Sequence, residues 1–144
     1  PALVKSTWHH LKPFPGAPEA IDRLRTKYTV VVLTILSWES IVCSSKSARV
    51  QWDGILSCEF LGYYKPSLQA YLKATRLLGL KPSEAMMVAA HEGDLAAARA
   101  AGLHTAFVNV PEEDHMAEGF EAPEVSSFDI EARDFDGLCR KLGV

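Results

Sequence analysis

Two continuous apolar runs constrain the fold of this chain most strongly: YTVVVLTI at residues 28–35 and AMMVAA at residues 85–90. Neither run alternates apolar with polar residues, and each leads into a helix-like segment. Runs of this kind are typical of parallel strands that are buried on both faces. The chain is therefore predicted to be an α/β protein built on a parallel sheet.

Weaker strand patterns and helical patterns alternate along the rest of the sequence. Further strands are predicted at residues 54–58, 104–110 and 128–130, and helices at residues 17–27, 38–48, 66–79, 93–102 and 134–143. This alternation favours right-handed crossovers between parallel strands. The helix at 66–79 is expected to place Leu68, Tyr71, Leu72 and Leu78 on one side. The acidic stretch at 111–124 is expected to form a long surface loop.

Length and composition narrow the class of protein. A chain of 144 residues with 48% hydrophobic and 23% charged residues is expected to form one globular domain. The net charge of −3 and the absence of a basic run argue against a nucleic-acid partner. The longest apolar run is too short to span a bilayer. Three widely spaced cysteines suit a reducing compartment, so a cytoplasmic location is expected.

Polar residues follow the predicted strands at the end of the sheet where ligands bind in such folds. Thr34 lies at the end of the first apolar run, Lys65 precedes the helix at 66–79, and His91 and Asp94 follow the second run. The macrodipole disfavours a lysine at a helix entrance, but a lysine that holds a negative ligand there is stabilised. A hydroxyl, an ammonium and a carboxylate together indicate a site for a small anionic substrate.

Each of these residues also has a purely structural explanation. Thr34 suits a strand or a helix cap, and Lys65 suits a solvated loop. Asp94 suits the first turn of the helix at 93–102, and His91 suits a structural hydrogen bond. The order and spacing of the residues, rather than any single one, favour a functional site.

That order resembles the haloacid dehalogenase superfamily of hydrolases, and most closely its 2-haloacid dehalogenase branch. The resemblance rests on YKPSLQAY at 64–71 and VAAHEGDLAAARAAG at 88–102, together with the threonine that ends the first strand. It implies a Rossmann-like parallel sheet flanked by helices. It also implies that residues 17–144 form the core domain and that residues 1–16 are a return segment from a cap or N-terminal region.

The resemblance assigns a role to each candidate residue. Thr34 is the second-motif hydroxyl that binds an oxygen of the substrate or intermediate. Lys65 is the third-motif cation that balances the nucleophilic carboxylate, and Asp94 is the fourth-motif acid that positions Lys65 or a water. Tyr71 matches a supporting tyrosine of the branch, and His91 matches a residue that lines the pocket.

One motif of the family is not found in this sequence. The family's nucleophile is an aspartate on a strand near the N-terminus, and no such motif precedes Thr34. Asp22 falls in a helical pattern, and Asp53 precedes a strand instead of following one. The nucleophile is therefore expected to lie outside this chain, which alone is expected to be inactive.

The family places the nucleophile's strand between the strand that ends at Thr34 and the one that ends at Ala90. Without it, a vacant slot is expected in the centre of the sheet, because neighbouring strands stand about 4.8 Å apart. Another polypeptide segment or a second chain, the segment PALVKS at residues 1–6, or direct pairing of the two strands would satisfy the backbone there. We expect the first of these.

The expected function is hydrolytic removal of halide from a small 2-haloalkanoic acid through an aspartyl ester, with no cofactor or metal. One alternative is a magnesium-dependent phosphatase of the same superfamily. In those phosphatases an acidic residue stands where this chain has Ala89 and Ala90, and magnesium needs several oxygen ligands. The other alternative is a catalytically dead core that binds a small anion or a protein partner.

Overall fold

The strands that the computed structural model describes all pair in parallel, but they form two sheets instead of one. The structure describes residues 11–111 and 128–144. In one sheet β1 (Val31–Thr34) pairs with β2 (Gly54–Ser57). In the other, β3 (Met86–Ala89) pairs with β4 (His104–Val108), which pairs with the edge strand β5 (Ile130–Ala132).

Helices connect these strands and cover both faces, which confirms the predicted α/β class. They are α2 (Ala17–Arg25), α3 (Trp38–Ala48), α4 (Cys58–Leu61), α5 (Leu68–Leu77), the 3₁₀ helix η1 (Pro82–Glu84), α6 (Glu92–Ala100) and α7 (Phe135–Leu142). Of these, α4 and η1 were not predicted. None of the helices that the structure describes is long and apolar enough to cross a membrane.

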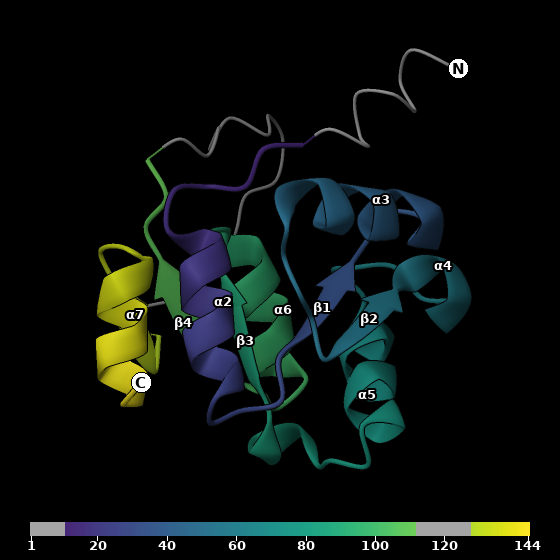
Figure 1. The fold of residues 1–144 in the computed structure, drawn as a ribbon. Coiled ribbons are helices and arrows are strands. Elements are labelled where there is room, and N and C mark those ends of the chain that lie inside the picture. The colour runs from purple at the N-terminus through teal and green to yellow at the C-terminus, as the bar shows by residue number, and fades with distance from the viewer. Residues whose placement is uncertain (1–10, 112–127) are drawn as a thin grey trace.

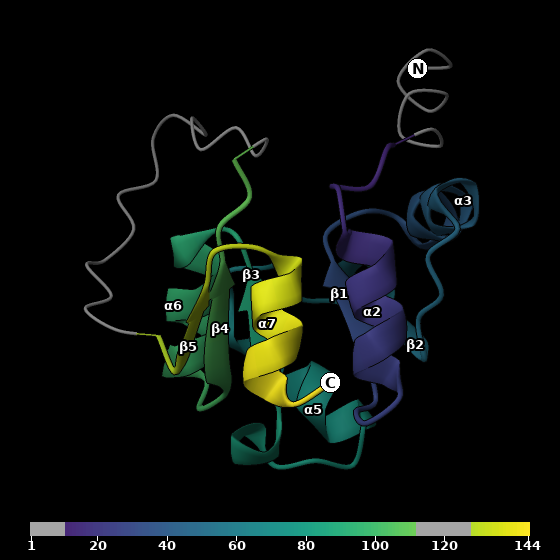
Figure 2. The same cartoon turned by 60° about the vertical axis from the view of Figure 1, so that its left-hand side comes forward.

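The two sheets stand beside one another with β1 and β3 as their nearest strands (Figures 1 and 2). Among the described residues, β1 pairs only with β2 and β3 only with β4, so the two strands do not pair directly, as expected. All four residues of β1 are partly exposed, and Val88 of β3 is 38% exposed. The expectation of complete burial was therefore wrong for this chain, because each strand lacks a described neighbour on one edge.

On one face, α2 and α7 join the two sheets. Ala20 and Leu24 of α2, the helix that leads into β1, pack in one cluster with Leu138 of α7 and with buried residues of β4 and β5. Arg23 also donates a hydrogen bond of 2.7 Å to Asp136, and this guanidinium holds the pKa of Asp136 below its ordinary value. Helix α2, which precedes β1, is thus attached through α7 to the sheet formed by β3, β4 and β5 (Figure 2).

On the other face, α5 and α6 join the sheets. Tyr71 of α5 and Ala98 of α6 are fully buried in one cluster. Leu33 of β1 and Met87 of β3 pack against the same cluster, so both sheets contribute to it. The alanine side of α6 allows close packing of the helix on the sheet.

The last strand begins two residues later than predicted, at Ile130 instead of residue 128. Asp129 uses its side chain where a strand residue would use its backbone: its carboxylate accepts the N–H of Thr105 at 2.7 Å. This backbone hydrogen bond is the main cause that lowers the pKa of Asp129. Most of the acidic stretch at 111–124, and residues 1–10 of the expected return segment, lie outside the described residues.

We predict that Leu138→Ala lowers the free energy of unfolding by about 2–5 kcal/mol, because it opens a cavity in the cluster that joins α2 and α7. Leu138 is 1% exposed. Leu77→Ala is the matched control, since Leu77 is also helical but 57% exposed, and it should change the value by no more than about 0.5 kcal/mol. Urea unfolding followed by circular dichroism measures both. Equal losses in the two variants would contradict this description of the core.

Candidate active site

The carboxyl ends of β1, β2 and β3 each lead to a polar residue at the same end of the molecule. Thr34 is the last residue of β1, and Ser57 is the last residue of β2. Asp94 lies in the first turn of α6, which follows β3. Lys65 lies between α4 and α5. Because the strands are parallel, these groups gather where the predicted site was placed.

Lys65 and Asp94, which were predicted from the sequence to lie in one site, form an ion pair. The Nζ of Lys65 lies 2.7 Å from Oδ2 of Asp94, and the two side chains are only 18% and 16% exposed. Lys65 is therefore not a solvated loop residue. Asp94 does more than complement the helix macrodipole, because it binds a cation from a segment 29 residues away.

Tyr71 completes this cluster from α5. Its phenol is fully buried and donates a hydrogen bond to Oδ1 of Asp94. Burial, and then the hydrogen bond to Asp94, raise the pKa of Tyr71 well above its ordinary value. Since the raised pKa keeps the proton on the phenol, Tyr71 acts as a neutral donor that fixes the carboxylate. Both oxygens of Asp94 are thus engaged, one by each partner.

The cluster leaves hydrogen-bonding capacity for a ligand. An ammonium has three donors, and Asp94 uses one donor of Lys65. The hydroxyl of Thr34 accepts the N–H of Leu36 at 3.1 Å, and no acceptor for its own proton is seen among the described residues. Lys65 and Thr34 therefore can both donate to an anion at this end of the sheet.

Thr34, unlike Tyr71, has no described hydrogen bond to the ion pair. Thr34 shares the sheet end with Lys65, but its described hydrogen bond is to its own turn. His91 is an exposed residue at the N-cap position of α6, where its carbonyl accepts the N–H of Leu95.

Sequence reasoning missed two residues that hold the turn after Thr34. The hydroxyl of Ser57 donates to the carbonyl of Leu36 at 2.6 Å, and Glu59 accepts the N–H of Trp38 at 2.9 Å. The sequence does carry a signal for a helix start here, because Ser57 follows an apolar run and precedes the acidic Glu59 by two residues. This is the pattern of a helix N-terminus, but α4 has only four residues and lacks any apolar periodicity.

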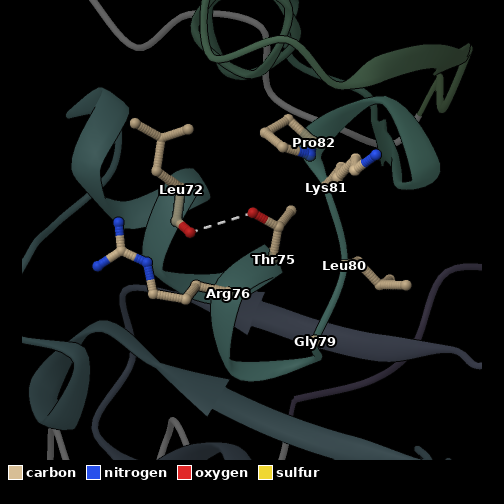
Figure 3. A pocket seen from close by; sticks show the side chains of 7 residues that line it. All are labelled: Leu72, Thr75, Arg76, Gly79, Leu80, Lys81 and Pro82. Carbon is tan, nitrogen blue, oxygen red and sulfur yellow. Dashed lines mark hydrogen bonds between the residues drawn. The ribbon is translucent and has the colours of Figure 1, made fainter.

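Two surface hollows of the described residues lie away from this cluster. One, of about 380 Å³, lies between the end of α5 and η1 and is lined by Leu72, Thr75, Arg76, Gly79, Leu80, Lys81 and Pro82 (Figure 3). The other lies beside β5 and α7. Neither contains Thr34, Lys65 or Asp94. Since η1 precedes β3, the first hollow lies at the opposite end of the sheet from Lys65.

Comparison with known proteins identifies several relatives of this chain. The family model described as haloacid dehalogenase-like hydrolase matches residues 3–102. A glyceraldehyde 3-phosphate phosphatase of Methanothermobacter thermautotrophicus is 28% identical over 119 residues, which cover 75% of this chain and 52% of that protein. This chain thus spans about half the length of that relative.

Two solved structures are more similar in sequence. The crystal structure of an L-2-haloacid dehalogenase is 36% identical with a TM-score of 0.85, and the match covers 94% of this chain and 60% of that one. The crystal structure of a defluorinating L-2-haloacid dehalogenase is 34% identical with a TM-score of 0.88, over 99% of this chain and 58% of that one. Each dehalogenase is therefore substantially longer than the part that this chain matches.

We predict that Tyr71 and Asp94 are energetically coupled. In a double-mutant cycle with Tyr71→Phe and Asp94→Asn, the coupling energy should be about 0.5–3 kcal/mol, because the two side chains share a buried hydrogen bond. Tyr71→Phe combined with Leu138→Ala on the other face is the control, and these two effects should add within about 0.5 kcal/mol. Urea unfolding gives all the values. A coupling no larger than that of the control pair would show that the hydrogen bond is absent in solution.

Proposed function

We propose that this chain, which belongs to the haloacid dehalogenase-like hydrolase family, supplies the charge-balancing and oxygen-binding residues, but not the nucleophile, of an enzyme that removes halide from a small 2-haloalkanoic acid. The single observation that carries the proposal is the buried cluster of Lys65, Asp94 and Tyr71 at the carboxyl end of the strands. The similarity to two L-2-haloacid dehalogenases at 36% and 34% identity supports the choice of reaction.

In the proposed reaction an aspartate carboxylate attacks C2 of the haloacid, and the carbon–halogen bond breaks as halide leaves. Water then hydrolyses the aspartyl ester, which releases the 2-hydroxy acid and restores the aspartate. Lys65 balances the negative charge of the nucleophile and of the substrate's carboxylate. Thr34 donates its hydroxyl proton to an oxygen of the substrate or intermediate. Asp94, fixed by Tyr71, keeps Lys65 in position.

The nucleophile is proposed to come from a strand that enters between β1 and β3. One inserted strand separates its neighbours by about 10 Å, and it would give each of the two strands its missing partner. We propose that a separate segment or a second chain supplies this strand, and that the 144-residue chain without it is inactive. The carboxyl end of such a strand would emerge between Thr34 and the ion pair.

The phosphatase alternative fits this donor set poorly. A curated relative is a phosphatase, but both oxygens of Asp94 are engaged by Lys65 and Tyr71. The ammonium of Lys65 also repels a metal cation at the carboxylate of Asp94. Ala89 and Ala90 carry no oxygen ligand in their side chains, and no group of three potential metal ligands occurs in the described part of the chain. The proposed reaction therefore uses no magnesium ion.

Chloride release from 2-chloropropionate tests the proposal. The 144-residue chain alone should release none. A longer protein that also includes the segment encoded upstream of Pro1 (the longer product) should release chloride at a rate that EDTA does not change. Turnover of a phosphate ester that EDTA abolishes would instead favour the phosphatase. Inactivity of the longer product on both substrates would favour the dead core.

Within that longer product, Lys65→Met should lower kcat by about 10²–10³-fold, because it removes the charge that balances two carboxylates while keeping the length of the side chain. Lys46→Ala is the control: Lys46 is an exposed lysine in the last turn of α3, and its loss should leave kcat unchanged. Wild-type turnover by Lys65→Met would reject the role given to Lys65.

A further inference from the structure

The turn between β1 and α3 is held by hydrogen bonds from the segment that leads to Lys65. Both backbone polar groups of Leu36 are hydrogen-bonded. Its N–H donates to the hydroxyl of Thr34 at 3.1 Å, and its carbonyl accepts a hydrogen bond from the hydroxyl of Ser57 at 2.6 Å. Thr34 and Ser57 are therefore connected through a single residue. They are also register partners in the β1–β2 pair.

Ser57 is also hydrogen-bonded to α4. It is completely buried, and its oxygen accepts the N–H of Glu59 at 3.2 Å while its proton is donated to Leu36. A serine hydroxyl has one proton to donate, so both of these bonds fix its orientation. Ser57 thus attaches the turn after Thr34 to the first turn of α4.

Glu59 makes the second connection between the same two segments. Its Oε2 accepts the N–H of Trp38 at 2.9 Å, and Trp38 is the first residue of α3. The first N–H groups of a helix have no partner within it, and a negative charge there is favourable. Glu59 therefore stabilises the start of α3 from a different helix.

The other end of α4 is fixed to α5, on the far side of Lys65. Lys73 of α5 donates a hydrogen bond of 2.7 Å to the carbonyl of Leu61. Gly62, with φ of 77°, ends α4 in the left-handed conformation that glycine adopts readily. Lys65 thus lies in a connection whose two flanking helices are attached to one another, and α4 is attached to the turn after Thr34.

We propose that Glu59 is a positioning residue that, through the hydrogen bond that its carboxylate on α4 accepts from the start of α3, sets the hydroxyl of Thr34 relative to the ammonium of Lys65. Glu59 need not touch the substrate. It acts by holding the turn that carries one donor against the segment that carries the other. The inference rests on the proposed function for its effect on turnover, but the structural connection is independent of which anion the site binds.

The test compares Glu59 with Glu84, which makes the same kind of bond at the opposite end of the sheet. Glu84 Oε2 accepts the N–H of Lys81 at 2.8 Å, and both glutamates are exposed. In the longer product, Glu59→Ala should lower kcat for 2-chloropropionate about 10- to 100-fold with little change in KM, because a misplaced donor no longer meets the developing charge. Glu59→Gln keeps an acceptor oxygen and should stay within about threefold of wild type, and Glu84→Ala should be unchanged.

Backbone amide NMR of the 144-residue chain provides a second readout that does not need turnover. Glu59→Ala should shift the amide signals of Leu36 and Lys65, whereas Glu84→Ala should shift neither. If the longer product does not turn over 2-chloropropionate, these shifts still support the positioning role while the proposed function fails. Unchanged signals at Leu36 and Lys65, or unchanged kcat in an active Glu59→Ala enzyme, would overturn the inference and leave Glu59 as a helix cap.

Discussion

The constraint on which this structure depends is that a buried strand needs a hydrogen-bonded neighbour on each edge. The sequences of β1 and β3 are those of interior strands, yet each has one described neighbour. The two sheets are instead held together by helices, with α2 and α7 on one face and α5 and α6 on the other. The partial exposure of β1 and of Val88 follows from the same cause.

The ion pair of Lys65 and Asp94 is better explained by chemistry than by stability. Two charges that are less than one-fifth exposed lose much of their hydration, and an apolar pair of similar size is often at least as stable. The pair is nevertheless completed by a third buried group, Tyr71, which has no other described partner. Such an arrangement holds a cation in a fixed position at the sheet end, where a strand between β1 and β3 would present its last residues.

The sequence predicted local features well and most contacts between distant segments poorly. The continuous runs gave β1 and β3, and the order of polar residues after the strands gave the Lys65–Asp94 pair, because parallel strands bring their ends together. Leu68 and Leu78, expected on the same side of the helix at 66–79 as Tyr71, are 44% and 37% exposed, whereas the small side chains of Ala70 and Ala74 are buried. The contacts of Ser57 and Glu59 join segments 21 residues apart, and no local pattern indicates such pairs.

Hydrogen–deuterium exchange tests most directly whether a strand enters between the two sheets. It compares the 144-residue chain with the longer product that includes the upstream segment. The account predicts that peptides covering β1 and β3 gain strong protection in the longer product, while those covering β2 and β5, which do not border the slot, keep the same exchange rates. Equal exchange of β1 and β3 in the two proteins would contradict the account.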